Sequence, residues 1–294
     1  MILNISGRTD IVAFYSDWLI NRLEAGYIDV RNPFNQQMVS RIMIEDVDLL
    51  FFCTKNPKPI LDKLKSIKKK VYFHVTLTPY KEDVEPCLLP KKEIIEAIKE
   101  LSEIIGKENL VIRYDPVFIN NEYTLEYHVK AFDKLCNLLD GYINRILISF
   151  IDNYKNVRKN YNILQYKELK EADYKTIGLS FSESARKHNI EVHTCAEENN
   201  LIEYGFIKDE CMSKELAFKL TGKTFKKWKA RKNVPCECIE MVDVGVYNSC
   251  KHFCKYCYAN FDEKKVKENY SNHNPNSSLL IGELKEDDII KIRK

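Results

Sequence analysis

Short apolar runs alternate with longer segments of helical periodicity over the first 200 residues of the chain. The short runs are rich in β-branched and aromatic residues and are too brief for ordinary helices. They are apolar at consecutive positions, which is typical of parallel strands that are covered on both faces. Strands are therefore predicted near residues 1–6, 27–31, 49–54, 71–77, 110–114, 145–150 and 190–195.

The segments between these runs have the pattern of amphipathic helices. In residues 11–25 the apolar side chains, including Trp18 and Leu19, fall roughly on one helical face. Thr9 or Asp10 stands at the expected N-cap position. Similar patterns predict helices over residues 91–105, 122–139 and 158–187.

This alternation predicts an α/β fold built on a parallel sheet. A TIM-like parallel (β/α) barrel, complete or incomplete, suits the length better than an open sheet. We assign the barrel to residues 1–198. Residues 199–294 are expected to be a cysteine-rich extension that packs on the barrel mouth as part of the same unit.

Composition narrows the function classes. The 46 basic and 43 acidic residues give a net charge of +3, which is too even to indicate a general nucleic-acid or membrane protein. No apolar run approaches the roughly 18 residues of a membrane helix, and the N-terminus lacks the pattern of a signal peptide. We therefore expect a cytoplasmic protein without a membrane partner. Its ten cysteines would then stay reduced, and several are better explained as metal ligands than as disulfides.

Polar and charged side chains follow the predicted strands. In a parallel barrel the carboxyl ends of the strands carry the functional groups, so cations at these ends would meet at one rim. They repel one another unless carboxylates or an anionic ligand balance them, which favours a ligand with carboxylate or phosphate groups. Each residue alone has a simpler explanation as a helix cap or turn. The cations are Arg8, Arg31, Lys55 and Arg113, and the carboxylates are Asp10, Asp115, Asp152 and Glu197.

The stretch CKHFCKYCYAN places three cysteines, Cys250, Cys254 and Cys257, at a C-x3-C-x2-C spacing. Such a loop wraps a four-iron, four-sulfur (4Fe-4S) cluster, because each thiolate reaches a different iron and one iron keeps no cysteine ligand. Zinc is an alternative, with His252 or a distant residue as the fourth ligand. Unliganded thiols are the third interpretation.

Four further cysteines precede this loop. Four thiols that lie near one another in a reducing cell bind a second iron–sulfur cluster or a structural zinc. The alternative is that they are small apolar residues of the core. The four are Cys195, Cys211, Cys236 and Cys238.

The spacing, with Tyr256 directly before the last cysteine, resembles the cluster loop of radical S-adenosylmethionine enzymes, and especially that of spore photoproduct lyase and its relatives. The resemblance implies that the open iron chelates S-adenosylmethionine. Reduction of the sulfonium would then give a 5′-deoxyadenosyl radical that abstracts hydrogen from the substrate. It also implies a reducing electron donor such as flavodoxin or ferredoxin. The match covers eleven residues.

A second resemblance covers nearly the full length. Five motifs run in the same order as in the bacterial domain-of-unknown-function family eighteen-forty-eight, which brings no substrate with it. The motifs are Ser6-Gly7-Arg8-Thr9-Asp10, Arg31-Asn32-Pro33, Thr54-Lys55-Asn56-Pro57, Arg113-Tyr114-Asp115-Pro116 and the cysteine-rich end.

The order of the parts departs from that of ordinary radical enzymes, in which the cluster loop follows the first barrel strand. Here the loop comes last, and no Gly-Gly-Glu-type segment follows Cys257. We therefore expect a permuted arrangement in which the C-terminal loop folds over the carboxyl rim of the barrel, above Arg8, Lys55 and Arg113.

The leading hypothesis is a radical S-adenosylmethionine enzyme that acts on an anionic small molecule or nucleotide. Nucleic-acid lesion repair is one alternative, with the basic, aromatic residues 223–232 as a candidate contact surface. A non-catalytic iron–sulfur redox or sensing protein is another. The catalytic candidates are Arg8, Asp10, Lys55, Arg113, Asp115 and Glu197, and the cofactor-binding candidates are Ser6, Arg8, Arg31, Asn32, Thr54, Asn56 and Tyr256.

Overall fold

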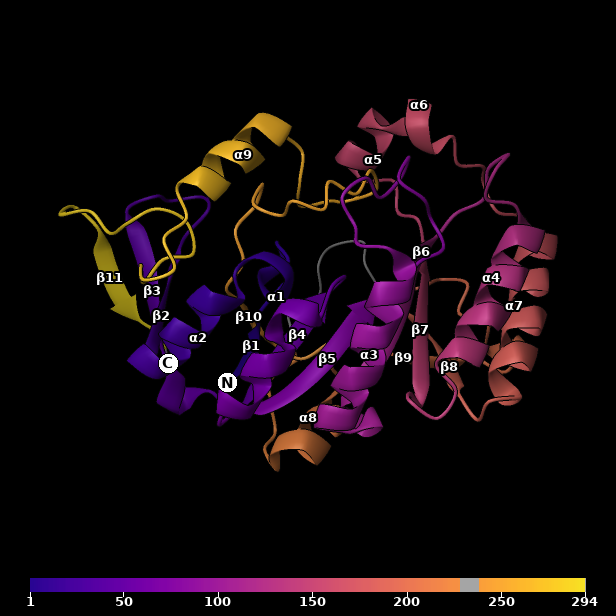
Figure 1. Cartoon of the computed structure of the whole chain (residues 1–294), viewed down its shortest axis with the longest axis horizontal. Helices are drawn as coiled ribbons and strands as arrows, with labels where there is room; N and C mark the ends of the chain where they lie inside the picture. The colour runs from indigo at the N-terminus through magenta and orange to yellow at the C-terminus, as the bar shows by residue number, and fades with distance from the viewer. Residues whose placement is uncertain (228–237, 294) are drawn as a thin grey trace.

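The computed structural model describes residues 1–227 and 238–293. Within these residues eight strands form one parallel sheet in the order β10-β1-β4-β5-β6-β7-β8-β9 (Figure 1). The expected α/β fold with a parallel sheet is thereby confirmed. In chain order the strands are β1 (Ile2–Asn4), β4 (Leu49–Thr54), β5 (Lys70–Thr76), β6 (Leu110–Val117), β7 (Arg145–Phe150), β8 (Glu191–Cys195), β9 (Ile207–Asp209) and β10 (Val242–Asp243).

A small second sheet lies at the far side of β1 and takes in the predicted strand 27–31 (Figure 1). That strand was expected in the main sheet, and this expectation is wrong. It pairs antiparallel with a strand that the sequence did not predict, and the last strand of the chain adds in parallel to the same neighbour. The three strands are β2 (Tyr27–Arg31), β3 (Met38–Met43) and β11 (Ile289–Ile292).

The α-helices match the apolar periodicity most closely where it is strongest. The segment 91–105 is one uninterrupted helix, whereas the two segments 11–25 and 158–187 are broken into shorter pieces. In the segment 11–25 the backbone of Tyr15 departs from helical geometry and divides the segment into two helices. The Tyr15 hydroxyl donates to the Ser249 carbonyl oxygen at 2.5 Å. The helices are α1 (Ile11–Phe14), α2 (Ser16–Ala25), α3 (Lys91–Ile105), α4 (Leu125–Leu138), α5 (Lys155–Lys159), α6 (Tyr161–Leu164), α7 (Glu171–Arg186), α8 (Lys214–Thr221) and α9 (Glu263–Ser271).

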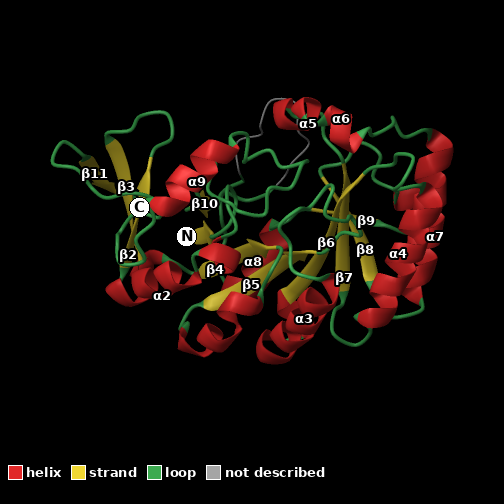
Figure 2. Ribbon diagram, turned by 45° about the horizontal axis from the view of Figure 1, so that its top comes forward, coloured by secondary structure: helices red, strands yellow, loops and turns green. Residues whose placement is uncertain are grey.

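Both faces of the main sheet are buried, as the continuous apolar strands predict. Alternate residues such as Phe52 and Phe73 pack against the helices of the first face, where α4 and α7 lie side by side (Figure 2). The residues between them, such as Phe51 and Tyr72, pack on the other face against Met212 and its neighbours in the segment after residue 198. The later part of the chain therefore completes the core.

The two edges of the main sheet also come from this later segment. Among the described residues, β9 pairs with β8 at one edge and β10 pairs with β1 at the other, and no ladder joins β9 to β10. The described helices include none that combines the length and the apolar character needed to cross a membrane.

Candidate functional site

The cysteine loop is closed at its base by Asn248, which adopts a left-handed backbone conformation (φ of 53°). Its backbone N–H donates to the Ala259 carbonyl oxygen at 3.0 Å, and its side-chain oxygen accepts from the N–H groups of Phe261 and Asp262 at 2.8 and 3.1 Å. Asn favours this conformation because its short polar side chain bonds locally. The result is a compact loop that carries the three cysteines.

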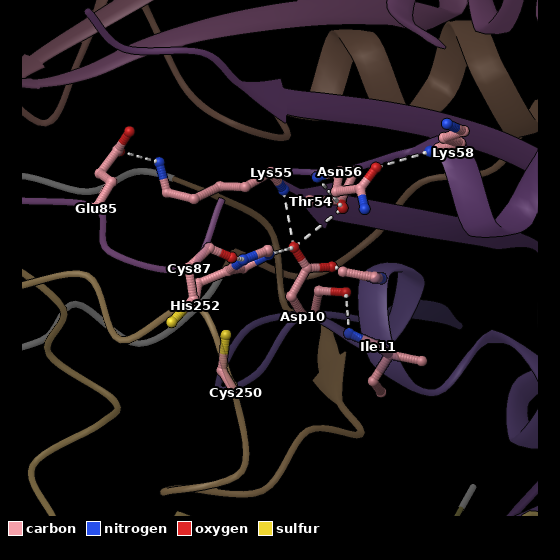
Figure 3. A network of polar contacts seen from close by, with 12 residues as sticks. Asp10, Ile11, Thr54, Lys55, Asn56, Lys58, Glu85, Cys87, Cys250 and His252 are labelled. Carbon is pink, nitrogen blue, oxygen red and sulfur yellow. Dashed lines mark hydrogen bonds and ion pairs between the residues drawn. The ribbon is translucent and has the colours of Figure 1, made fainter. Parts of the chain in front are cut away.

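Asp10 joins this loop to the carboxyl ends of the first two neighbouring strands (Figure 3). One carboxylate oxygen caps α1 by accepting from the Ala13 N–H at 3.0 Å. The other accepts from the Thr54 hydroxyl at 3.0 Å and the Lys55 N–H at 2.8 Å, and it lies 2.9 Å from His252 Nε2 of the loop. Asp10 is therefore a cap and a link between β1, β4 and the cysteine loop.

Glu85 provides a second link, next to the first. Its carboxylate is 1% exposed and forms ion pairs with Lys55, at 2.8 Å, and with Lys91. It also accepts hydrogen bonds from the Thr78 hydroxyl at 2.6 Å and from the Tyr256 hydroxyl of the loop. Burial by itself would raise the pKa of Glu85, but the two ammonium groups outweigh it and lower the pKa to about 2.

The three loop cysteines interact electrostatically with one another; Cys254 is buried, and Cys250 and Cys257 are partly buried. Burial raises the pKa of all three thiols, that of Cys254 to about 12 even though Lys55 lowers it. In the described residues no group of three or more His, Cys, Asp or Glu side chains stands in single-ion geometry. A cubane cluster has a different requirement, since each thiolate binds a different iron, and three soft thiols on one short loop suit that donor set.

Comparison with known proteins gives one family match, which covers both the main sheet and the cysteine loop. The family described as "Domain of unknown function (DUF1848)" matches residues 2–259, from β1 to just past Cys257. The chain belongs to this family. No curated protein and no solved structure matches the chain. The match thus includes both the strands of the main sheet and the three loop cysteines of this DUF1848 member.

Arg8 follows β1 and Arg113 lies within β6, and each already has a carboxylate partner. Arg8 Nε donates to Asp243 Oδ2 at 2.7 Å, and Arg113 Nε donates to Asp115 Oδ2 at 2.9 Å. The Ser149 hydroxyl donates to the same oxygen of Asp115 at 3.3 Å. The cations are thus neutralised in pairs, as the charge argument required.

Arg31 and Asn32 do not join this group, contrary to expectation. Arg31 lies in the small sheet and forms an ion pair with Asp288, with Nη2 and Oδ2 2.6 Å apart. The Asn32 side chain accepts from the Phe34 N–H at 2.8 Å and closes the turn between β2 and β3. Both residues are displaced because their strand pairs antiparallel with β3 instead of entering the parallel sheet.

The other cofactor-binding candidates lie close to Asp10. The Ser6 hydroxyl accepts from the Ile11 N–H at 3.3 Å, and the Asn56 side chain accepts from the Lys58 N–H at 3.1 Å. These two contacts are capping contacts, so each of these side chains has a local structural role. Cys236 and residues 228–232 of the basic segment lie outside the described residues.

Two residues of the site, Glu85 and Asp243, were not predicted from the sequence. Glu85 lies in the irregular segment after β5 rather than directly at a strand end, and Asp243 comes from the late strand β10. The sequence signal for these two carboxylates is charge, because the largely buried side chains of Lys55 and Arg8 each need a carboxylate partner.

Glu197, two residues after β8, accepts from the Phe150 N–H at 2.9 Å. Burial, together with Asp152 and Asp115, raises its pKa to about 8, which is in the range of a general acid or base at neutral pH. The folded protein therefore holds a proton on Glu197 that the unfolded chain releases above a pH of about 4.5.

A pH titration of stability tests this environment. Between pH 4.5 and 8 the Glu197 proton makes the wild-type free energy of unfolding fall as pH rises, by up to about tenfold in the unfolding constant per pH unit. Glu197→Gln is neutral at every pH and is expected to remove this slope in urea unfolding at pH 5 to 8. Glu103→Gln, at an exposed position of α3, serves as the control. Parallel pH profiles of wild type and Glu197→Gln would contradict the raised pKa.

Proposed function

We propose that this protein is an iron–sulfur enzyme of the radical S-adenosylmethionine type, in which Cys250, Cys254 and Cys257 hold a 4Fe-4S cluster. The observation that carries the proposal is the position of the cysteine loop. Its side chains His252 and Tyr256 contact the buried carboxylates Asp10 and Glu85 at the carboxyl edge of a parallel sheet. Catalytic groups of parallel α/β folds gather at this edge, which supports a catalytic role over that of a peripheral electron carrier.

The donor set fits such a cluster. Cys250, Cys254 and Cys257, on one short loop, would each hold one iron of the cluster, and the remaining iron would be available to S-adenosylmethionine. With that cofactor bound, the cluster supplies one-electron reductive cleavage of a carbon–sulfur bond, fed by a donor of the flavodoxin or ferredoxin type.

The protein side chains hold this arrangement in place. Tyr256 is fixed by Glu85, which keeps the segment between Cys254 and Cys257 against the sheet. Lys55, held by the same carboxylate, brings a positive charge next to Cys254 and so favours its thiolate. Burial of these groups keeps water away from a reactive intermediate.

We assign the substrate side of the site to the carboxyl ends of β6, β7 and β8. Glu197 is the candidate for proton transfer, because its pKa of about 8 lies near neutral pH. The proposed substrate is an anionic small molecule. Arg113 and Arg8 are already paired, so its anionic group would compete with Asp115 or Asp243 for them.

Anaerobic reconstitution tests the proposal. Wild type is expected to carry about four irons and four sulfides per chain, as a single 4Fe-4S cluster requires. On strong reduction it should release 5′-deoxyadenosine from S-adenosylmethionine. The triple variant Cys250→Ala, Cys254→Ala, Cys257→Ala should lose both properties, whereas Cys136→Ala, inside α4, should keep both.

Two results would overturn parts of this proposal. Iron retained by the triple variant would remove the loop from the cluster site. A loop-dependent cluster that never cleaves the cofactor would instead indicate a redox or sensing protein.

A further inference from the structure

Three cysteine thiols outside the loop meet between the two edges of the main sheet. Cys195 ends β8, Cys211 follows β9 by two residues, and Cys238 precedes β10 by four. The sulfur atoms of Cys195 and Cys211 are 3.3 Å apart, and the Cys238 side chain hydrogen-bonds both. These contacts bring together chain segments that flank β9 on one side and β10 on the other.

The surroundings of these thiols suit bound negative charge. Arg113 Nη1 donates to the Cys211 sulfur at 3.0 Å, and the same nitrogen lies 3.5 Å from His74 Nδ1. Arg113 also contacts Asp115, which fixes the guanidinium in place. An N–H donor on a cysteine sulfur is the usual second layer around a thiolate metal site, since it orients the ligand and disperses its charge. His74 is fully buried, and its Nε2 has no hydrogen-bond partner among the described residues.

The sulfur spacing distinguishes a single ion from a cluster. Zinc–sulfur bonds of about 2.3 Å in tetrahedral geometry place neighbouring sulfurs about 3.8 Å apart. Cysteines that bind different irons of a cluster stand further apart. The 3.3 Å contact is a hydrogen bond between the two sulfurs, which needs a proton on one of them and does not stand in metal geometry. A shift of about half an ångström would bring this pair to the zinc spacing.

We propose that Cys195, Cys211 and Cys238 bind one zinc ion, which joins the two edges of the main sheet. The three ligands bind as thiolates, and their negative charge is balanced by the ion and by Arg113, which donates to the Cys211 sulfur. A structural zinc ion takes four ligands. The three cysteines supply three of them, and we assign no described residue as the fourth. Among the described residues β9 and β10 do not pair with each other, so the ion would join these two edges of the sheet in place of backbone hydrogen bonds. This site is separate from the proposed iron site and uses none of its ligands.

Metal analysis of the full chain, purified from zinc-containing medium, tests the site. About one zinc per chain is expected, and Cys211→Ser and Cys238→Ser should each lose it. The loop triple variant Cys250→Ala, Cys254→Ala, Cys257→Ala should keep its zinc, as should Cys136→Ser. If the loop cysteines hold no iron–sulfur cluster, the expected zinc content is unchanged. If the protein holds no zinc, the expected iron content is likewise unchanged.

A measurement on wild type tests the site even if the cysteine variants fail to fold. Cobalt(II) added to metal-free wild type should give the strong sulfur-to-cobalt charge-transfer absorption of a tetrahedral thiolate site, and zinc should displace it. Wild type that binds neither ion would overturn the proposal, as would a Cys211→Ser variant that keeps its zinc. Eight irons in wild type that fall to four in Cys211→Ser would also overturn it, because they would replace the zinc by a second cluster.

Discussion

Replacing Glu85 with glutamine is expected to lower the free energy of unfolding by about 3–5 kcal/mol, the usual cost of removing one partner of a buried ion pair. The carboxylate is 1% exposed and pairs with two ammonium groups, of which Lys55 is 12% exposed. Glutamine keeps the shape but leaves both lysines without a counter-charge. Urea unfolding at neutral pH measures the loss.

The effect of Glu85→Gln on the free energy of unfolding should also depend on pH. The pKa of Glu85 is lowered to about 2, so its contribution is fully present above the unfolded value of about 4.5 and is lost as pH falls toward 2. The difference between wild type and Glu85→Gln should therefore shrink between pH 4.5 and 2.

A matched control separates burial from pairing. Lys58 and Glu93 are 2.9 Å apart, but both are about half exposed. Glu93→Gln should therefore cost only about 0–1 kcal/mol. Equal effects of the two substitutions would show that the Glu85 network contributes no more than a surface ion pair.

Replacing Asp10 with alanine is expected to cost about 3–5 kcal/mol, because several buried donors lose their acceptor and each costs about 1–3 kcal/mol. The donors are the N–H groups of Ala13 and Lys55 and the Thr54 hydroxyl, and His252 loses its contact as well. Since His252 belongs to the cysteine loop, the loop should also loosen. In metal-free protein, Cys250 and Cys254 should be alkylated faster.

Asp262→Ala serves as the control for capping alone. Asp262 is exposed and caps α9 by accepting from the N–H groups of Lys264 and Lys265 at 3.0 and 3.1 Å. Its loss should cost about 1 kcal/mol. An Asp10→Ala variant that is no worse than this, with unchanged alkylation rates, would reduce Asp10 to a simple cap.

The parallel sheet and α3 could be predicted from the sequence because continuous apolar runs and 3.6-residue periodicity are local signals. The assignment of residues 27–31 failed for the same reason. Whether a short apolar strand pairs in parallel or antiparallel depends on its partner, and β3 alternates too weakly to be recognised. The edge strands β9 and β10 are two or three residues long, which is too short for any periodicity.

The candidate site was predictable where strand ends carry its residues and not where loops do. Asp10, Thr54 and Lys55 follow or end strands, and parallel topology alone brings such residues to one edge. Glu85 and Asp243 reach it through an irregular segment and a distant strand, which no spacing rule describes. Their positions follow from the need of buried lysine and arginine side chains for counter-charge.

The pairing of β10 with β1 has a consequence for synthesis on the ribosome. Residues 2–4 emerge first, yet their second neighbour is residues 242–243. At about 5–20 residues per second, that partner follows after roughly 12–50 s. During this interval one edge of β1 stays open to association with other chains. The cysteine loop emerges later still, so its thiols reach the carboxyl edge only after all strands of the main sheet have been synthesised.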